Sequence, residues 1–170
     1  HVLRGHDWLP STPIHLLVYK YLDYQLPQIG HLTDILDPKG GKLSKRNASA
    51  SCEDLLSLGF LPEAILNFVM LLGWAPKDNR ELFTLEEFVE AFDVNGLQKA
   101  NPTFNQTKLD WFNGHYLRQT HDKTLTKLLK PYIPTKKVQS DSIKLEDIVP
   151  LIKDRITKLS EFTSLAGFFY

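Results

Sequence analysis

The sequence predicts a mixed, mainly α-helical fold, in which a short α/β segment precedes a bundle of helices. Strand-like residues are confined to the part of the chain before about residue 50, and helix-starting and helix-ending signals then alternate to the carboxyl end. No internal repeat or low-complexity segment interrupts this order. The 170 residues, of which 42% are hydrophobic, suffice for one domain or for two small domains that share a core.

The α/β segment is predicted from its turn and cap signals. Residues 1–5 are expected to form the end of a strand that runs into a turn. The Ser-Thr-Pro sequence at residues 11–13 begins a helix, with a hydroxyl cap followed by a proline where no amide donor is needed, and this helix continues to about Leu22. Residues 29–36 are expected to form a second strand, and residues 37–41 a flexible turn.

The next three helices are predicted from their first residues. Ser51 begins a short helix that ends near Gly59, and the Leu-Pro-Glu sequence at residues 61–63 begins another that stops at Gly73. Thr84, with a glutamate three residues later, fits a capping box. The buried face of this third helix is expected to consist of Phe88, Val89 and Phe92.

The remaining helices follow at similar spacing. Asn105 is expected to cap a helix that ends near Gly114. Residues 123–132 and 143–159 are predicted to form two more helices, and Pro150 is expected to interrupt the second of them.

Composition excludes some classes of protein and leaves others open. The 20 basic residues balance the 20 acidic ones, whereas a dedicated nucleic-acid binder is usually basic, so the total charge favours no partner. No run of about 20 apolar residues predicts a membrane span, and no signal peptide begins the chain. The single cysteine, Cys52, allows no internal disulfide, and the six histidines show no zinc spacing, so no metal site is expected.

Residues 40–46, Gly-Gly-Lys-Leu-Ser-Lys-Arg, form the segment most informative about chemistry. The two glycines allow the backbone to reorient easily, and Lys42 and Lys45 carry compact charges that suit phosphate oxygens. The residues alone fit either a phosphate-binding loop or a solvated basic loop. The pattern of a Walker phosphate loop is absent.

The same loop resembles a known motif. Residues 42–46, KLSKR, resemble the KMSKS motif of class I aminoacyl-tRNA synthetases in the form found in glutamyl enzymes, and residues 1–13 resemble the segment HVIRGEEWLPSTP of that family. Residues 59–64, 71–74 and 108–114 resemble further blocks in the same order. The chain is identified as a member of the glutamyl-tRNA synthetase family, with a good match over residues 1–118.

The resemblance implies a division of the chain. Residues 1–50 would be the carboxy-terminal part of a Rossmann-type α/β catalytic domain with the KLSKR loop. Residues 51–120 would be a helical stem-contact domain, and residues 121–170 the start of a helical anticodon-binding region. The HIGH motif of the first half of the catalytic domain is not found, so we expect a fragment that is inactive alone.

The resemblance also implies a reaction in two steps. Glutamate attacks the α-phosphate of ATP, which acts with Mg²⁺, to give glutamyl-adenylate and pyrophosphate, and the terminal adenosine of tRNA(Glu) then takes the glutamyl group. Glutamyl enzymes typically need tRNA to be bound before they activate the amino acid. A monomer located in the cytoplasm is expected.

Site residues follow from the matched positions. Lys42 and Lys45 would bind the ATP phosphates and neutralise the leaving pyrophosphate, with the larger effect from Lys45. Arg4 would hold the carboxylate of glutamate, for which a guanidinium is suited. The other ATP contacts would be Asp7, Trp8, Ser44 and, through the backbone, Ile35 and Leu36, and the tRNA contacts would be Lys108, Trp111 and Arg118.

Several alternatives remain open. Arg4 also fits a surface arginine, and Trp8 and Trp111 also fit core residues. The family commonly has two acids before the tryptophan, whereas this chain has His6 and Asp7, so the role of His6 is undefined. A glutaminyl-tRNA synthetase, a glutamyl-queuosine synthetase, and a non-catalytic tRNA-binding module or paralogue are the competing functions.

Overall fold

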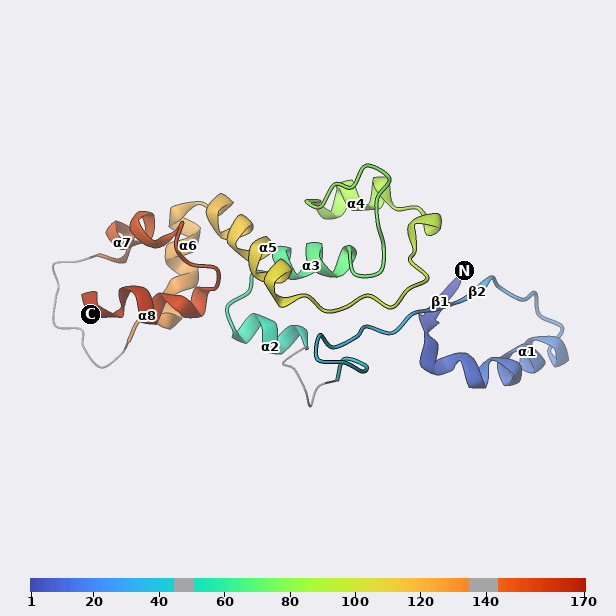
Figure 1. The fold of residues 1–170 in the computed structure, drawn as a ribbon. Helices are drawn as coiled ribbons and strands as arrows, with labels where there is room; N and C mark the ends of the chain where they lie inside the picture. The colour runs from blue at the N-terminus through green and yellow to red at the C-terminus, as the bar shows by residue number, and fades with distance from the viewer. Residues whose placement is uncertain (45–50, 135–143) are drawn as a thin grey trace.

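The computed structural model describes residues 1–44, 51–134 and 144–170. The chain is mainly helical and elongated, with a small sheet at one end and the last helices at the other (Figure 1). The helices α3 and α5 lie between these two ends. Among the described helices, none has the length and apolar character that crossing a membrane requires.

The small sheet consists of two parallel strands, β1 (Val2–Gly5) and β2 (Ile29–Leu32). They are connected through the 3-10 helix η1 (His6–Ser11) and helix α1 (Thr12–Tyr21), which confirms the first predicted strand and the first predicted helix. The predicted second strand, residues 29–36, begins as expected but ends earlier, at Leu32. The chain of β1 turns into η1 after Gly5 and offers no partner beyond Leu32, and Leu36 pairs instead with Lys42 and Thr103.

Helices α2 (Cys52–Ser57) and α3 (Pro62–Met70) begin where the sequence predicts. The hydroxyl of Ser51 accepts a hydrogen bond from the backbone amide of Asp54 at 3.1 Å, which caps α2. Gly59 follows α2 with a φ of +88°, and a Cβ at this position would lie 2.7 Å from the amide nitrogen of Ser160. The turn between α2 and α3 therefore requires glycine.

Helix α4 (Leu85–Ala91) has the predicted capping box at Thr84 and lies over a cluster of aromatic rings. The ring of Trp74 packs against Phe88 and Phe92 with centroid distances of 5.0 and 5.8 Å. The predicted buried face is wrong for Val89, which is 67% exposed, and for Phe92, which is 40% exposed although its ring touches Trp74. Helix α4 is only two turns long and covers the cluster with one narrow face, and Val89 lies outside that face. The 3-10 helix η2 (Val94–Gly96) follows it.

Helix α5 (Gln106–Gln119) begins at the predicted cap, since the side chain of Asn105 accepts a hydrogen bond from the amide of Lys108 at 3.0 Å. The prediction that it ends near Gly114 is wrong. Gly114 is buried inside the helix, and the next turn continues because Leu117 is fully buried in the core. Helix α3 packs along α5.

The last helices are α6 (Asp122–Leu129), α7 (Leu145–Ile152) and α8 (Phe162–Ala166). The 3-10 helices η3 (Lys130–Tyr132), η4 (Leu159–Glu161) and η5 (Gly167–Phe169) connect or extend them.

The helix predicted over residues 143–159 ends earlier, at Ile152, and Pro150 does not interrupt it as predicted. Pro150 lies inside α7, and the helix continues to Ile152. The chain then turns back, so that the amide of Leu159 donates to the carbonyl oxygen of Gly59 at 3.0 Å.

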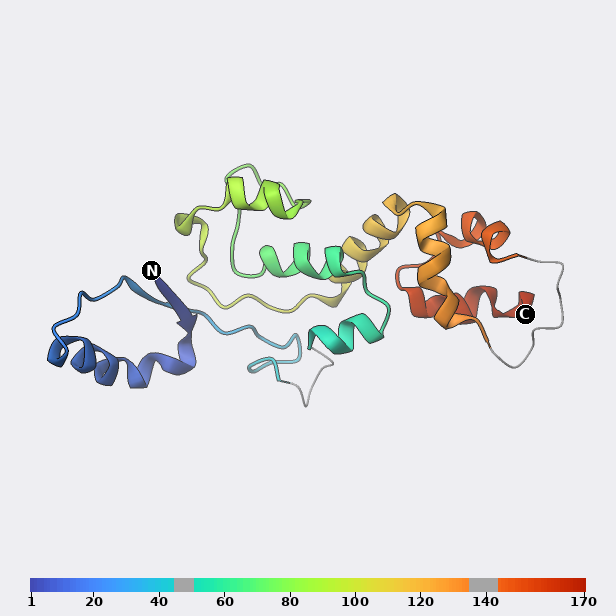
Figure 2. The ribbon, with the colours of Figure 1, turned by 180° about the vertical axis from the view of Figure 1, so that it is seen from behind.

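One hydrophobic core runs through the helical part, from Leu55 of α2 to Ala166 of α8. The view from behind shows the same order of helices, from the sheet to the carboxyl end (Figure 2). A second, smaller cluster of Met70, Trp74 and Phe83 lies under α4. Helix α5 buries Leu109, Phe112 and Leu117 in the larger core and leaves Trp111 exposed on its other face.

Candidate functional site

The candidate site begins at the carboxyl edge of the two-stranded sheet. Gly5 and Leu32 are paired in the parallel register, so β1 and β2 end at the same edge. Asp7 and Asp34 each follow two residues after this pair. In open α/β sheets, ligands bind outside the carboxyl ends of the strands, which makes this edge the natural place for chemistry.

The ammonium group of Lys42 lies between these two carboxylates. It donates a hydrogen bond to the carboxylate of Asp7 and lies 3.0 Å from an oxygen of Asp34. The hydrogen bonds that Lys42 donates to Asp7 and then to Asp34 raise the pKa of Lys42, and the hydrogen bond from Lys42 lowers the pKa of Asp7. Lys42 and Asp7 therefore both stay charged at neutral pH.

A tight turn carries Lys42 to this position. The amide of Asp37 donates to the carbonyl oxygen of Gly41, and the amide of Gly40 donates to that of Asp37, both at 2.9 Å. Gly40 and Gly41 have φ values of +103° and +81°, a backbone conformation that favours glycine. The glycines thus shape the turn in front of Lys42. Lys45 and Arg46 lie outside the described residues.

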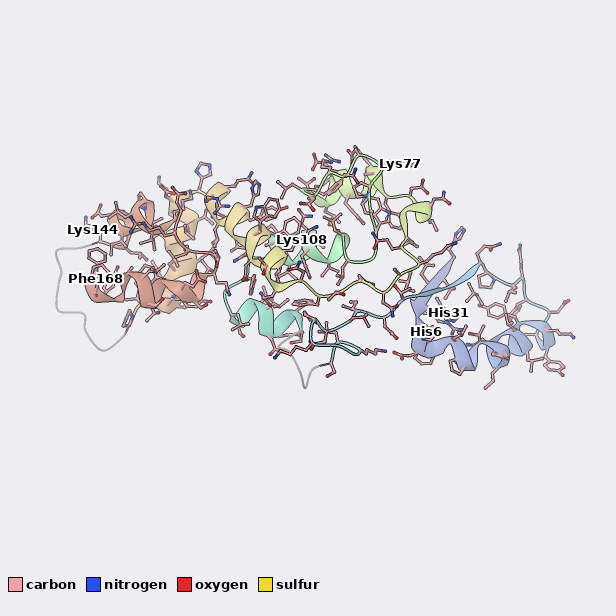
Figure 3. All side chains as sticks on the ribbon, in the orientation of Figure 1. His6, His31, Lys77, Lys108, Lys144 and Phe168 are labelled. Carbon is pink, nitrogen blue, oxygen red and sulfur yellow. The ribbon has the colours of Figure 1, made fainter. Side chains whose placement is uncertain are left out.

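Arg4 is held at the same end of β1 by three side chains. Its Nε donates to Nε2 of His31 at 3.2 Å, and its two terminal nitrogens lie 2.8 Å from Nδ1 of His15 and from the hydroxyl of Thr12. His31, labelled in Figure 3, lies on β2, where the parallel register pairs it with Arg4. A guanidinium has five N–H donors, so one N–H on each terminal nitrogen remains for a ligand. Three side chains thus fix the position of the guanidinium of Arg4.

The other residues predicted to contact ATP lie on η1 and in the segment that precedes Lys42. Trp8 is 56% exposed on η1, so the interpretation of this side chain as a core residue is wrong. His6, two residues before Trp8, is also exposed. The amide of Leu36 donates to the carbonyl oxygen of Pro102 at 2.8 Å, and the carbonyl of Ile35 accepts from Leu43 at 2.8 Å. These backbone groups fix the loop. The carbonyl oxygen of Leu36 also accepts from the amide of Phe104 at 2.9 Å, so both backbone groups of Leu36 are already engaged.

A second candidate surface follows the outer face of α5. Lys108, Trp111 and Arg118 lie on this face, three or seven residues apart, and His115 lies between the last two. Trp111 is 45% exposed and stacks on the ring of His115 at a centroid distance of 6.1 Å, so its interpretation as a core residue is wrong. Lys108, labelled in Figure 3, pairs with Glu81 at 2.6 Å.

The described residues contain no cluster of three or more His, Cys, Asp or Glu side chains that could hold a metal ion.

Residues 1–111 match the family described as class I tRNA synthetases (E and Q), catalytic domain. The chain belongs to this family. The match extends beyond residue 50 and includes α2, α3, α4 and the first part of α5.

Relatives of the synthetase family align with the whole chain. Glutamate–tRNA ligase 1 of Pseudothermotoga lettingae is 38% identical over 171 residues, and the glutamate–tRNA ligase of Dehalococcoides mccartyi is 41% identical over 175 residues. Both alignments cover 100% of this chain and 36% of the relative. The chain thus spans little more than a third of the length of these synthetases.

Solved structures of synthetases share the fold. The glutamate-tRNA synthetase of Elizabethkingia anophelis superposes with a TM-score of 0.86 at 33% identity, over 99% of this chain and 38% of that chain. A glutamate tRNA ligase from Elizabethkingia meningosepticum, solved in complex with its amino acid, gives a TM-score of 0.84 at 33% identity over 99% of this chain. The arrangement of helices and sheet described above is therefore that of this family.

The structure brings together some residues that the sequence predicted separately and adds others. Asp7 and Lys42 lie far apart in the sequence and meet at the sheet edge. Sequence reasoning missed Asp34 beside Lys42, the three side chains that hold Arg4, and His115. The parallel register, which pairs Arg4 with His31, brings one of them to the site and has no local signal in the sequence.

Proposed function

We propose that this chain is part of a glutamate–tRNA ligase that joins L-glutamate to tRNA(Glu) through glutamyl-adenylate. The observation that carries the proposal is the ammonium of Lys42, held at the carboxyl edge of the sheet in a chain that belongs to the class I synthetase family. A carboxylate oxygen of glutamate attacks the α-phosphorus of ATP, and pyrophosphate leaves with the electrons of the broken P–O bond. A ribose hydroxyl of the tRNA then attacks the carbonyl carbon, and AMP leaves.

The roles of the site residues follow from the charge that the first step develops. Negative charge grows on the leaving pyrophosphate, and lysine ammonium groups stabilise it best when they are already in place. We assign this role to Lys42 and Lys45. Asp7, Trp8, Ser44 and the backbone of Ile35 and Leu36 would complete the ATP site. Mg²⁺ would arrive with ATP, because this ion is usually bound through phosphates and only one or two carboxylates.

Arg4 is proposed to bind the glutamate substrate. Its guanidinium is oriented by three hydrogen-bond partners and keeps one donor on each terminal nitrogen. Two N–H groups in a fixed plane match the two oxygens of a carboxylate, which a lysine cannot reproduce.

The outer face of α5 is proposed to contact the tRNA. An exposed indole can stack on a base or pack on a ribose, and lysine and arginine bind phosphates. Trp111, Lys108 and Arg118 supply these groups from one face of one helix. The salt bridge between Lys108 and Glu81 would have to exchange for a phosphate contact.

The arrangement of the whole protein is part of the same proposal. Residues 1–50 would be the KLSKR-containing part of a Rossmann-type catalytic domain. Residues 51–120, most of which fall inside the family match, would form the stem-contact helices, and residues 121–170 the start of the anticodon-binding region. We propose a monomer that acts in the cytoplasm.

Charging of tRNA by the full-length protein tests this function. Arg4→Lys keeps the charge and removes the planar fork, so we expect the KM for glutamate to rise about 10- to 100-fold, as for one lost charged hydrogen bond. The KM for ATP should stay within about twofold, because Arg4 is assigned no ATP contact. An equal rise in the KM for glutamate and in the KM for ATP would contradict the assignment of Arg4 to glutamate binding. Faster charging with glutamine than with glutamate would reassign the substrate.

A further inference from the structure

We propose that Asp34 is a positioning residue, which holds Lys42 so that one of its N–H groups is aimed at a phosphate oxygen. This inference rests on the proposed function, in which Lys42 contacts ATP. Asp34 is not among the residues that the family motifs single out, and it acts through Lys42 without touching the substrate.

The sheet places the carboxylate of Asp34 next to Lys42. Because β1 and β2 are parallel and Gly5 pairs with Leu32, the residues two positions beyond each strand emerge side by side at one edge. One is Asp7 and the other is Asp34. The oxygen of Asp34 lies 3.0 Å from the Lys42 ammonium.

Asp34 is the more firmly placed of the two carboxylates. Its side chain is 26% exposed, whereas that of Asp7 is 70% exposed. The backbone that follows Asp34 is hydrogen-bonded to the segment that contains Lys42. Leu36 pairs with Lys42 in an antiparallel bridge, and the carbonyl oxygen of Ile35 accepts from the amide of Leu43. Asp34 and Lys42 therefore belong to one hydrogen-bonded unit, which Asp7 joins from η1.

Two carboxylates leave Lys42 with a defined donor. An ammonium group has three N–H donors, and Asp7 and Asp34 take two of them. We assign the third N–H to a phosphate oxygen. Because the flexible lysine stem is already fixed, little reorganisation is needed when charge develops on the leaving group.

The test is glutamate-dependent ATP–pyrophosphate exchange by the full-length protein with tRNA present. We expect Asp34→Asn to lower kcat about 10-fold, less than the roughly 10²- to 10³-fold cost of losing a direct donor, with the KM for ATP within about twofold. Asp34→Glu should restore part of the rate. Asp154→Asn, an exposed aspartate among the last helices, is the matched control and should leave both constants unchanged.

A double-mutant cycle decides whether Asp34 acts through Lys42. In a Lys42→Met background, Asp34→Asn should cause no further loss, because the group it positions is gone. A further loss of the same size would show a merely structural role and overturn the proposal. A lower KM for ATP in Asp34→Asn would overturn it too, since Asp34 would then compete with the phosphates for Lys42.

A readout without catalysis separates this proposal from the proposed function. The hydrogen bonds that Lys42 donates to both carboxylates raise its pKa, so Asp34→Asn should lower this pKa in an NMR titration of the lysine side chains of the full-length protein. An unchanged pKa would overturn the pairing of Asp34 with Lys42. If the wild type shows no exchange while the pKa responds, the proposed function fails and the pairing stands.

Discussion

Replacing Asn113 by alanine would remove one buried amide that ties α5 to two distant segments. The side chain of Asn113 is fully buried. Its oxygen accepts a hydrogen bond from the amide of Leu61 at 2.7 Å, and its nitrogen donates to the carbonyl oxygen of Thr157 at 2.5 Å. Alanine leaves both backbone groups without this partner.

The magnitude follows from the burial of the two groups. The amide of Leu61 is buried, and an unsatisfied buried donor costs about 1–3 kcal/mol. The carbonyl of Thr157 stays partly accessible to water, so it loses only the net value of a hydrogen bond, about 0.5–1.5 kcal/mol. The loss of stability for Asn113→Ala should therefore be about 3 kcal/mol. Asn105→Ala removes the exposed cap of the same helix and should cost about 1 kcal/mol.

Hydrogen exchange in the full-length protein measures this difference locally. Peptides that contain Leu61 should exchange roughly a hundredfold faster in Asn113→Ala, as expected for a loss of about 3 kcal/mol in the free energy of opening. Asn105→Ala should raise the exchange rate of the same peptides by about tenfold at most. Equal exchange in the two variants would show that the buried amide contributes no more than an exposed cap, and the reasoning would be refuted.

Three further predictions concern the helical part. Trp111→Ala should weaken binding of tRNA about 5- to 100-fold in a titration at fixed salt, the loss expected for one stacked base, whereas Val89→Ala on α4 should leave binding unchanged. Burial opposes ionisation of Glu161, yet hydrogen bonds from Thr157 lower its pKa below the ordinary 4.5. Its contribution to stability is therefore complete above pH 4.5 and is lost as the pH falls through the lowered value, so urea midpoints should fall less on acidification in Glu161→Gln. Gly59→Ala should lower the melting temperature more than Gly41→Ala, because both have positive φ values and only Gly59 lacks room for a Cβ.

Local signals in the sequence were sufficient for the helix starts. Ser51, Thr84 and Asn105 each cap the predicted helix, because a cap depends on residues within one turn of the chain. Helix ends were less predictable. The end of α5 depends on Leu117, which packs in a core that distant helices build. Pro150 lies inside α7, whose residues Ile148, Val149 and Ile152 pack in the same core.

The candidate site could be predicted only in part. The resemblance located Arg4, Asp7 and Lys42, because their motifs are continuous in the sequence. Asp34 and His31 were missed, since their relation to the site depends on the parallel register and on a turn of the loop. A pairing of strands across a crossover of this length leaves no local signal in one sequence.

The central claim, that Lys42 and Lys45 serve an adenylate-forming site for glutamate, is tested most directly by ATP–pyrophosphate exchange. The full-length protein should be assayed with and without tRNA and glutamate, next to its Lys45→Ala variant. The account predicts exchange that requires glutamate and is strongly reduced in the variant, with a smaller effect on ATP binding. Absence of exchange under every condition, with tRNA binding retained, would contradict the account and would identify a non-catalytic tRNA-binding module.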